Sequence, residues 1–273
     1  FRERHTLLLA VNGLYALSRA PDEAAADIRQ VIRGEAPEDL KQRVKDALQT
    51  ALRRAGSDAD LAALIQLAGL YSAEFGDQLD EDPFAGEFLS LLRQAADHFQ
   101  QNEPMKHLFT QSLIANGFPG TPAGTAAREH TIQGAFEAVA SVRETPSSPA
   151  ASPSSLPGKS SEAMDNSTDH HLLAVYDGPE RFFVLCAPRR KGSLSLENGS
   201  YRVAVMTPIG SIQPFRTERI LENQHVVSNY YVRTSGTKDQ PMSRAYGEYR
   251  LLREEDKGRR NVDGKTGRLI EQP

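Results

Sequence analysis

The stretch Arg143–Thr168, RETPSSPAASPSSLPGKSSEAMDNST, divides the chain into two parts of different character. It contains four prolines and eight serines and almost no large apolar side chains. A segment of this composition buries too little apolar surface to offset the entropy that is lost when a chain becomes ordered. We therefore predict a flexible Pro/Ser-rich linker over residues 143–170, with a folded domain on either side.

The residues before this stretch have the pattern of amphipathic helices. Apolar side chains recur at three- and four-residue intervals, as in Leu40, Val44 and Leu48, which places them on one helical face. Prolines open several of these segments and glycines close them. Each such helix has to bury its apolar face, so residues 1–142 are predicted to form an all-α helical bundle. With 13 Lys and Arg against 20 Asp and Glu, its net charge is −7.

The residues after the stretch change to a period of two, which is typical of strands. The runs rich in β-branched and aromatic residues lie at 172–176, 181–187, 200–206, 226–233 and 244–252. Asn198-Gly199 predicts a hairpin turn. Because the connections are too short for helical crossovers, we expect a mostly antiparallel β-sandwich or small barrel over residues 171–253. Residues 254–273 are predicted to be a polar, disordered tail, and the whole chain is an α+β protein with two segregated domains.

Location follows only weakly from the sequence. The single cysteine, Cys186, forms no internal disulfide, which favours a cytoplasmic protein, and its apolar surroundings predict a buried thiol. No apolar run approaches the roughly 20 residues that a membrane-spanning helix needs. Since the first residue is Phe1, we expect a processed chain or a fragment, and an upstream anchor is the open alternative.

Local motifs for catalysis or metal binding are weak. The sequence 258–266 ends in Gly-Lys-Thr, but five residues separate its glycines where a phosphate-binding loop has four. The polar run Asp165–His171 has metal-ligand residue types without a metal-site spacing, and the acidic run Asp77–Asp82 is predicted to be a solvated loop. We therefore predict no catalytic residue, no metal site and no cofactor.

Arginine and tyrosine occur together in the predicted β domain. Residues 171–273 carry 17 Lys and Arg against 12 Asp and Glu, a net charge of +5, and six of the eight tyrosines. Guanidinium groups beside aromatic rings suit anionic or single-stranded nucleic-acid partners, although ordinary sheets also pair such residues across strands. The candidate binding residues are Arg202, Tyr231, Arg233, Arg244, Tyr246 and Arg250.

The sequence thus favours a non-enzymatic interaction or adaptor protein of two modules. In this interpretation, the helical bundle docks on a protein partner or self-associates as a homo-oligomer. The tethered β domain then binds an anionic partner, with nucleic acid as one candidate. The rival interpretation is a hydrolase-like enzyme whose site is assembled from carboxylates and histidines distant in sequence.

Overall fold

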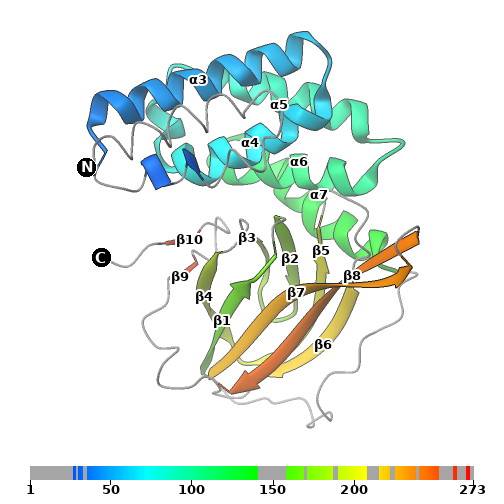
Figure 1. Cartoon of the computed structure of the whole chain (residues 1–273). Helices are drawn as coiled ribbons and strands as arrows, with labels where there is room; N and C mark the ends of the chain where they lie inside the picture. Colours follow the sequence, from blue (N-terminus) through cyan, green and yellow to red (C-terminus); the bar gives the residue numbers. More distant parts are fainter. Residues whose placement is uncertain are drawn as a thin grey trace. The chain divides into compact units, whose positions relative to one another are not determined.

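The computed structural model is an α+β protein with helices in its N-terminal part and two mostly antiparallel sheets in its C-terminal part (Figure 1). It describes residues 27–28, 30–32, 36–140, 158–168, 171–186, 190–207, 215–221, 225–237, 240–251, 261–262 and 269–270. The chain forms two compact units, residues 1–101 and 102–273. Within the described ranges, no helix is long and apolar enough to cross a membrane.

The first unit is helical. It contains α3 (Glu38–Ser57), α4 (Leu61–Phe75), the 3₁₀ helix η1 (Gly76–Glu81) and α5 (Ala85–Phe99). In the predicted apolar stripe of α3, Val44 and Leu48 are fully buried and Leu40 is half-buried. The side chain of Asp60 caps α4 by accepting a hydrogen bond from the amide of Ala63 at 3.1 Å. The aromatic side chains of this unit pack around the Tyr71 ring, whose centroid lies 5.2–5.6 Å from those of three phenylalanines, Phe75, Phe84 and Phe88.

The last two helices belong to the second unit. These are α6 (Pro104–Gly117) and α7 (Pro122–Ala138), and α7 contacts strands β2 (Leu172–Asp177) and β3 (Arg181–Cys186). The guanidinium of Arg128 on α7 lies 6.0 Å from the Phe183 ring centroid. The compact units therefore divide before α6, whereas the sequence predicted a division after residue 142. An amphipathic pattern shows that a helix buries a face, but it does not show what covers that face.

The strands form two sheets. The six-stranded sheet has the order β10-β9-β4-β1-β7-β8, and the four-stranded sheet has the order β3-β2-β5-β6. Among the described pairs, β1–β7 and β4–β9 are parallel and the others are antiparallel. The remaining strands are β1 (Lys159–Asn166), β4 (Lys191–Glu197), β5 (Gly199–Met206), β6 (Phe215–Leu221), β7 (His225–Thr237), β8 (Gln240–Leu251), β9 (Asn261–Val262) and β10 (Leu269–Ile270).

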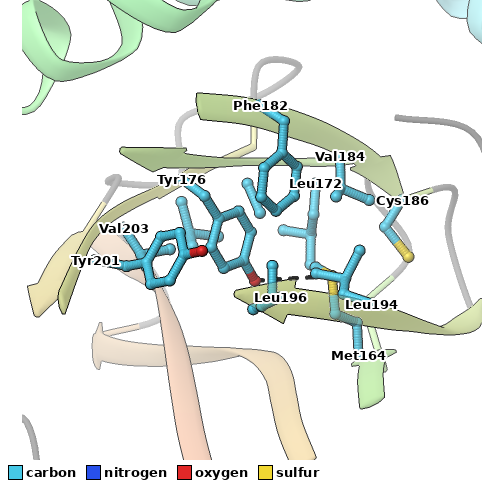
Figure 2. Packing of buried hydrophobic residues seen from close by; sticks show 12 residues of the cluster. Met164, Leu172, Tyr176, Phe182, Val184, Cys186, Leu194, Leu196, Tyr201 and Val203 are labelled. Atoms are coloured by element: carbon cyan, nitrogen blue, oxygen red, sulfur yellow. Dashed lines mark hydrogen bonds between the residues drawn. The ribbon is translucent and has the colours of Figure 1, made fainter. Parts of the chain in front are cut away.

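Both sheets contribute to one hydrophobic core (Figure 2). Met164, Leu194 and Leu196 come from the six-stranded sheet, and the other members come from the four-stranded sheet. The rings of Tyr176 and Phe182 stack with centroids 4.8 Å apart. Every residue of the cluster is at most 3% exposed, so its burial is a main source of the stability of this unit.

Strand β1 corrects the linker prediction, because Lys159–Asn166 lies within residues 143–170. Its alternate residues point inward and three of them are polar, yet each of these three makes a hydrogen bond to a group distant in sequence. The Tyr176 hydroxyl donates to Glu162 Oε1 at 3.0 Å, and Asn166 Nδ2 donates to the Cys186 carbonyl at 3.1 Å. Buried polar groups with such partners are compatible with a strand. Residues 143–157 of the predicted linker lie outside the described residues.

Asn198-Gly199 is a corner between the two sheets and not the predicted hairpin turn. Strand β4 before it belongs to the six-stranded sheet, whereas β5 after it belongs to the four-stranded sheet. Gly199 has φ +145°, and a Cβ there would lie 2.5 Å from Pro179 Cγ, so the corner requires glycine. The side chain of Asn198 accepts a hydrogen bond from Ser160 Oγ at 2.8 Å, which ties the corner to β1.

The predicted disordered tail, residues 254–273, contains two short strands. Residue Asn261 of β9 pairs with Ser193 of β4, and β10 pairs with β9. The six-stranded sheet thus extends into a segment whose polar composition gave no strand signal. The other residues of 252–273 lie outside the described ranges.

Candidate functional site

Strands β7 and β8 form a long antiparallel ribbon at one side of the six-stranded sheet. The sequence of each strand alternates, and Ser235-Gly236-Thr237 ends β7 in small and polar residues that suit a turn. The pairing runs from Val226 opposite Leu251 to Thr237 opposite Gln240. This register decides which of the predicted binding residues come together.

The register brings five of the six candidate residues onto one face. Tyr231 lies opposite Tyr246, and Arg233 lies opposite Arg244. Arg250 is on the same face, because it is four residues beyond Tyr246 and successive strand residues alternate between faces. We call this set the Arg/Tyr ladder: Tyr231, Arg233, Arg244, Tyr246 and Arg250. Sequence alternation alone relates residues within each strand, whereas the register joins the two strands.

The ladder lies on the face of the sheet that is opposite to the hydrophobic core. Met164 of β1 is in the core and pairs with Ser228 of β7, so these two positions define the inner face. The ladder residues of β7 are odd-numbered and therefore share the outer face with Asp165 of β1. The side chain of Asp165 pairs with Lys191 at 2.6 Å on that face.

The ladder continues past the end of its neighbouring strand. The pairing of β1 with β7 ends at Asn166 opposite Tyr230, and Tyr231–Thr237 pairs with β8 alone among the described strands. In the register, Arg233 is directly opposite Arg244.

Arg202 is separate from the ladder. It is on β5 in the four-stranded sheet, where the register forms the row Arg181, Asp177, Arg202 across three strands. Both guanidiniums pair with the Asp177 carboxylate, and the Arg202 guanidinium lies 5.1 Å from the Phe136 ring of α7. Alternating charges across strands stabilise a sheet. The sequence pattern did not distinguish this ion-paired arginine from those of the ladder.

The tyrosines also divide into two groups. Tyr176 and Tyr201 are at most 1% exposed and belong to the core, and burial raises the pKa of the Tyr201 phenol. They are therefore packing residues. Tyr231 and Tyr246 are the tyrosines that share the ladder face.

The net charge of the second unit is smaller than that of the β domain predicted from the sequence, so it gives less support to the binding of an anion. Residues 102–273 carry 21 Lys and Arg against 19 Asp and Glu, a net of +2, because residues 102–170 add 7 acidic residues against 4 basic ones. Residues 1–101 carry 11 against 17, a net of −6. Attraction of an anion by the second unit therefore has to come from the local placement of arginines and not from the charge of the whole unit.

The described residues of the polar run 165–171 make structural contacts. Asp165 pairs with Lys191, and the side chain of Asn166 accepts hydrogen bonds from the amide and hydroxyl of Thr168. His171 is 8% exposed, and its ring centroid lies 5.2 Å from that of Phe109 on α6. In the described part of the chain, no group of three or more His, Cys, Asp or Glu side chains is arranged to hold a metal ion.

Cys186 is 1% exposed in the core, and burial raises the pKa of its thiol to about 12. We expect Cys186→Ala to lower the free energy of unfolding by about 1 kcal/mol, because a small apolar group is replaced by a slightly smaller one. Denaturant unfolding checks this value. A thiol reagent should label the native chain no faster than the core opens, and rapid labelling would contradict a buried thiol.

Comparison with known proteins adds no assignment. No protein-family model matches this sequence, and searches of curated proteins and of solved structures find no significant match.

Proposed function

We propose that this chain is a non-enzymatic interaction protein whose β ribbon binds an anionic partner through the Arg/Tyr ladder. The observation that supports the proposal is the β7–β8 register, which sets an Arg–Arg pair beside a Tyr–Tyr pair on one face. The guanidinium of arginine binds phosphate or carboxylate, and the tyrosine ring offers a surface for stacking. Single-stranded nucleic acid has both a phosphate chain and flat bases, so it is the partner that this combination fits best.

The helical unit has a different role in this proposal. Its net charge of −6 makes it a poor surface for nucleic acid, so we assign it to docking on a protein partner or to self-association. Attachment of this unit to an assembly would raise the local concentration of the ladder near its target without any new contact at the ladder.

Removal of one ladder arginine should weaken nucleic-acid binding. We expect Arg244→Gln to lower the affinity for a single-stranded oligonucleotide about threefold to tenfold at low salt, and to reduce the slope of log affinity against log salt by about 0.7, as for one lost phosphate contact. Fluorescence anisotropy of the full chain at several salt concentrations measures both quantities. Arg43→Gln is the matched control, because it removes the same charge from an exposed position on α3.

Tyrosine variants separate stacking from charge. Tyr246→Phe keeps the ring and should keep the affinity, whereas Tyr246→Leu should weaken binding to the oligonucleotide more than to an acidic peptide of equal charge. Equal weakening by Arg43→Gln and Arg244→Gln would overturn the ladder as the site. Tighter binding of the acidic peptide than of the oligonucleotide would assign the ladder to an acidic protein instead.

A further inference from the structure

Two histidines meet between α6 and α7. His107 on α6 and His130 on α7 have their Nε2 atoms 2.9 Å apart, and their rings are nearly perpendicular with centroids 4.8 Å apart. His107 is 6% exposed, whereas His130 is exposed. The pair therefore has one ring fixed in the helix interface and the other open to solvent.

The spacing of the two nitrogens is the spacing that a metal ion requires. Imidazole nitrogens bind Zn²⁺ at about 2.0–2.1 Å, so two nitrogens on one ion with a bond angle between 90° and tetrahedral lie about 2.9–3.3 Å apart. The 2.9 Å between the two Nε2 atoms lies within this range, and it is also the length of a hydrogen bond between the two rings in the metal-free chain. We propose that His107 and His130 form a two-histidine chelate for a divalent late transition metal ion.

Neutral imidazole is the form that binds metals. The positive charge next along α6, Lys106, is paired with Glu103.

The donor set indicates which ions would bind. Imidazole suits Cu²⁺, Ni²⁺ and Zn²⁺. Such a site binds Cu²⁺ more tightly than it binds Ni²⁺ or Zn²⁺. In the described residues, no third histidine, cysteine or carboxylate completes a cluster with this pair, so water would occupy the other coordination positions. Such a chelate would bridge α6 and α7 and stabilise the packing of the two helices.

Copper binding by the untagged full chain tests the proposal. We expect one Cu²⁺ per chain in calorimetric titration, with two equatorial imidazole nitrogens in the electron paramagnetic resonance spectrum and a higher Tm for the copper-bound chain. His130→Ala should weaken the affinity by about tenfold or more, because a chelate becomes a single ligand. Its spectrum should then contain one imidazole nitrogen or none, and its Tm should no longer rise with Cu²⁺.

His98→Ala is the matched control, because His98 is an exposed histidine on α5 in the other unit. It should bind Cu²⁺ as the wild type does. Equal Cu²⁺ affinity of the wild type and His130→Ala would overturn the site, as would an equal loss in His98→Ala. Since His130 is exposed, the metal-free Tm of His130→Ala should stay within a few degrees of the wild-type value, which separates a lost ligand from a lost fold.

Discussion

Replacing Asp82 with alanine is expected to lower the free energy of unfolding by about 3–5 kcal/mol, because the change leaves a mostly buried lysine without its counter-charge. Asp82 lies in the acidic run that the sequence predicted to be a solvated loop. Its side chain is 3% exposed, and Lys45 Nζ lies 2.9 Å from Asp82 Oδ2 with the lysine side chain 14% exposed. The solvated-loop prediction is therefore wrong at this residue.

Asp82 also joins three elements of the first unit. The Tyr71 hydroxyl of α4 donates to Asp82 Oδ2 at 2.6 Å, and the amide of Phe84 donates to Oδ1 at 2.9 Å at the start of α5. Gln49 on α3 donates to the Tyr71 oxygen at 2.9 Å. Loss of the carboxylate thus breaks a shared network and not one isolated ion pair.

The same carboxylate should make the stability depend on acid. Burial acts to raise the pKa of Asp82, but hydrogen bonds from Tyr71, Lys45 and the Phe84 amide outweigh it and hold the pKa below its ordinary value of 3.8. The contribution to stability is therefore complete above about pH 4 and is lost as the pH falls through the folded-state pKa. Wild type and Asp82→Ala should converge in stability in this acidic range.

Urea unfolding at pH 7 and at pH 3 measures both effects. The matched control is Asp58→Ala, which removes an exposed partner of Arg54 and should change the stability by no more than about 1 kcal/mol. A cost below about 1 kcal/mol for Asp82→Ala at pH 7 would show that the network does not hold the helices together. The double variant Lys45→Met with Asp82→Asn should recover part of the loss, because it removes the uncompensated charge.

The helices were predictable because their physics is local. The spacing of Leu40, Val44 and Leu48 predicted a helix where α3 lies, and Val44 and Leu48 are fully buried. What the pattern could not give was the partner of each helix. The sequence of α7 gave no sign that this helix contacts β2 and β3 in the second unit.

The missed strand β1 shows a different limit. Its sequence KSSEAMDN has the composition of a loop, and its buried Glu162 and Asn166 are acceptable only because Tyr176 and the Cys186 carbonyl are there to bond them. Those partners lie 14 and 20 residues away along the chain. A prediction from composition uses only the polarity of each residue. Whether a polar residue can be buried depends on the hydrogen-bond partners that the fold places beside it.

The candidate site was predictable in residue type and not in geometry. Alternation placed Tyr231 with Arg233, and Tyr246 with Arg244, but only the register shows that the two pairs face each other. The same alternation gave no reason to separate Arg202, which pairs with Asp177 on the other sheet. The His107–His130 pair gave no sequence signal, because its 23-residue separation matches no metal-site spacing.

The turn between α6 and α7 leaves no room at Gly124. A Cβ on this residue would lie 1.8 Å from the carbonyl oxygen and 2.6 Å from the carbonyl carbon of Phe118. That oxygen also accepts hydrogen bonds from the amide and the hydroxyl of Thr121, at 3.1 and 2.9 Å. The Thr121 hydroxyl oxygen in turn accepts from the Gly124 amide at 3.1 Å and caps α7. The obstacle is therefore backbone that is held in place and cannot move aside as a flexible side chain could.

We expect Gly124→Ala to lower the free energy of unfolding by about 3 kcal/mol or more, since the methyl group has to displace the turn and open the cap of α7. Alanine has a higher helix propensity than glycine, which alone would raise the free energy of unfolding by about 1 kcal/mol. A net decrease would therefore show that the steric clash is the larger effect. Gly120→Ala is the matched control, because a Cβ there meets nothing within 4 Å. The control should be neutral or slightly stabilising, as alanine restricts the unfolded chain.

Thermal and urea unfolding of both variants compare the two positions. Equal stability of Gly124→Ala and Gly120→Ala would show that the turn is looser than its hydrogen bonds indicate, and that α7 begins without the close approach of Phe118.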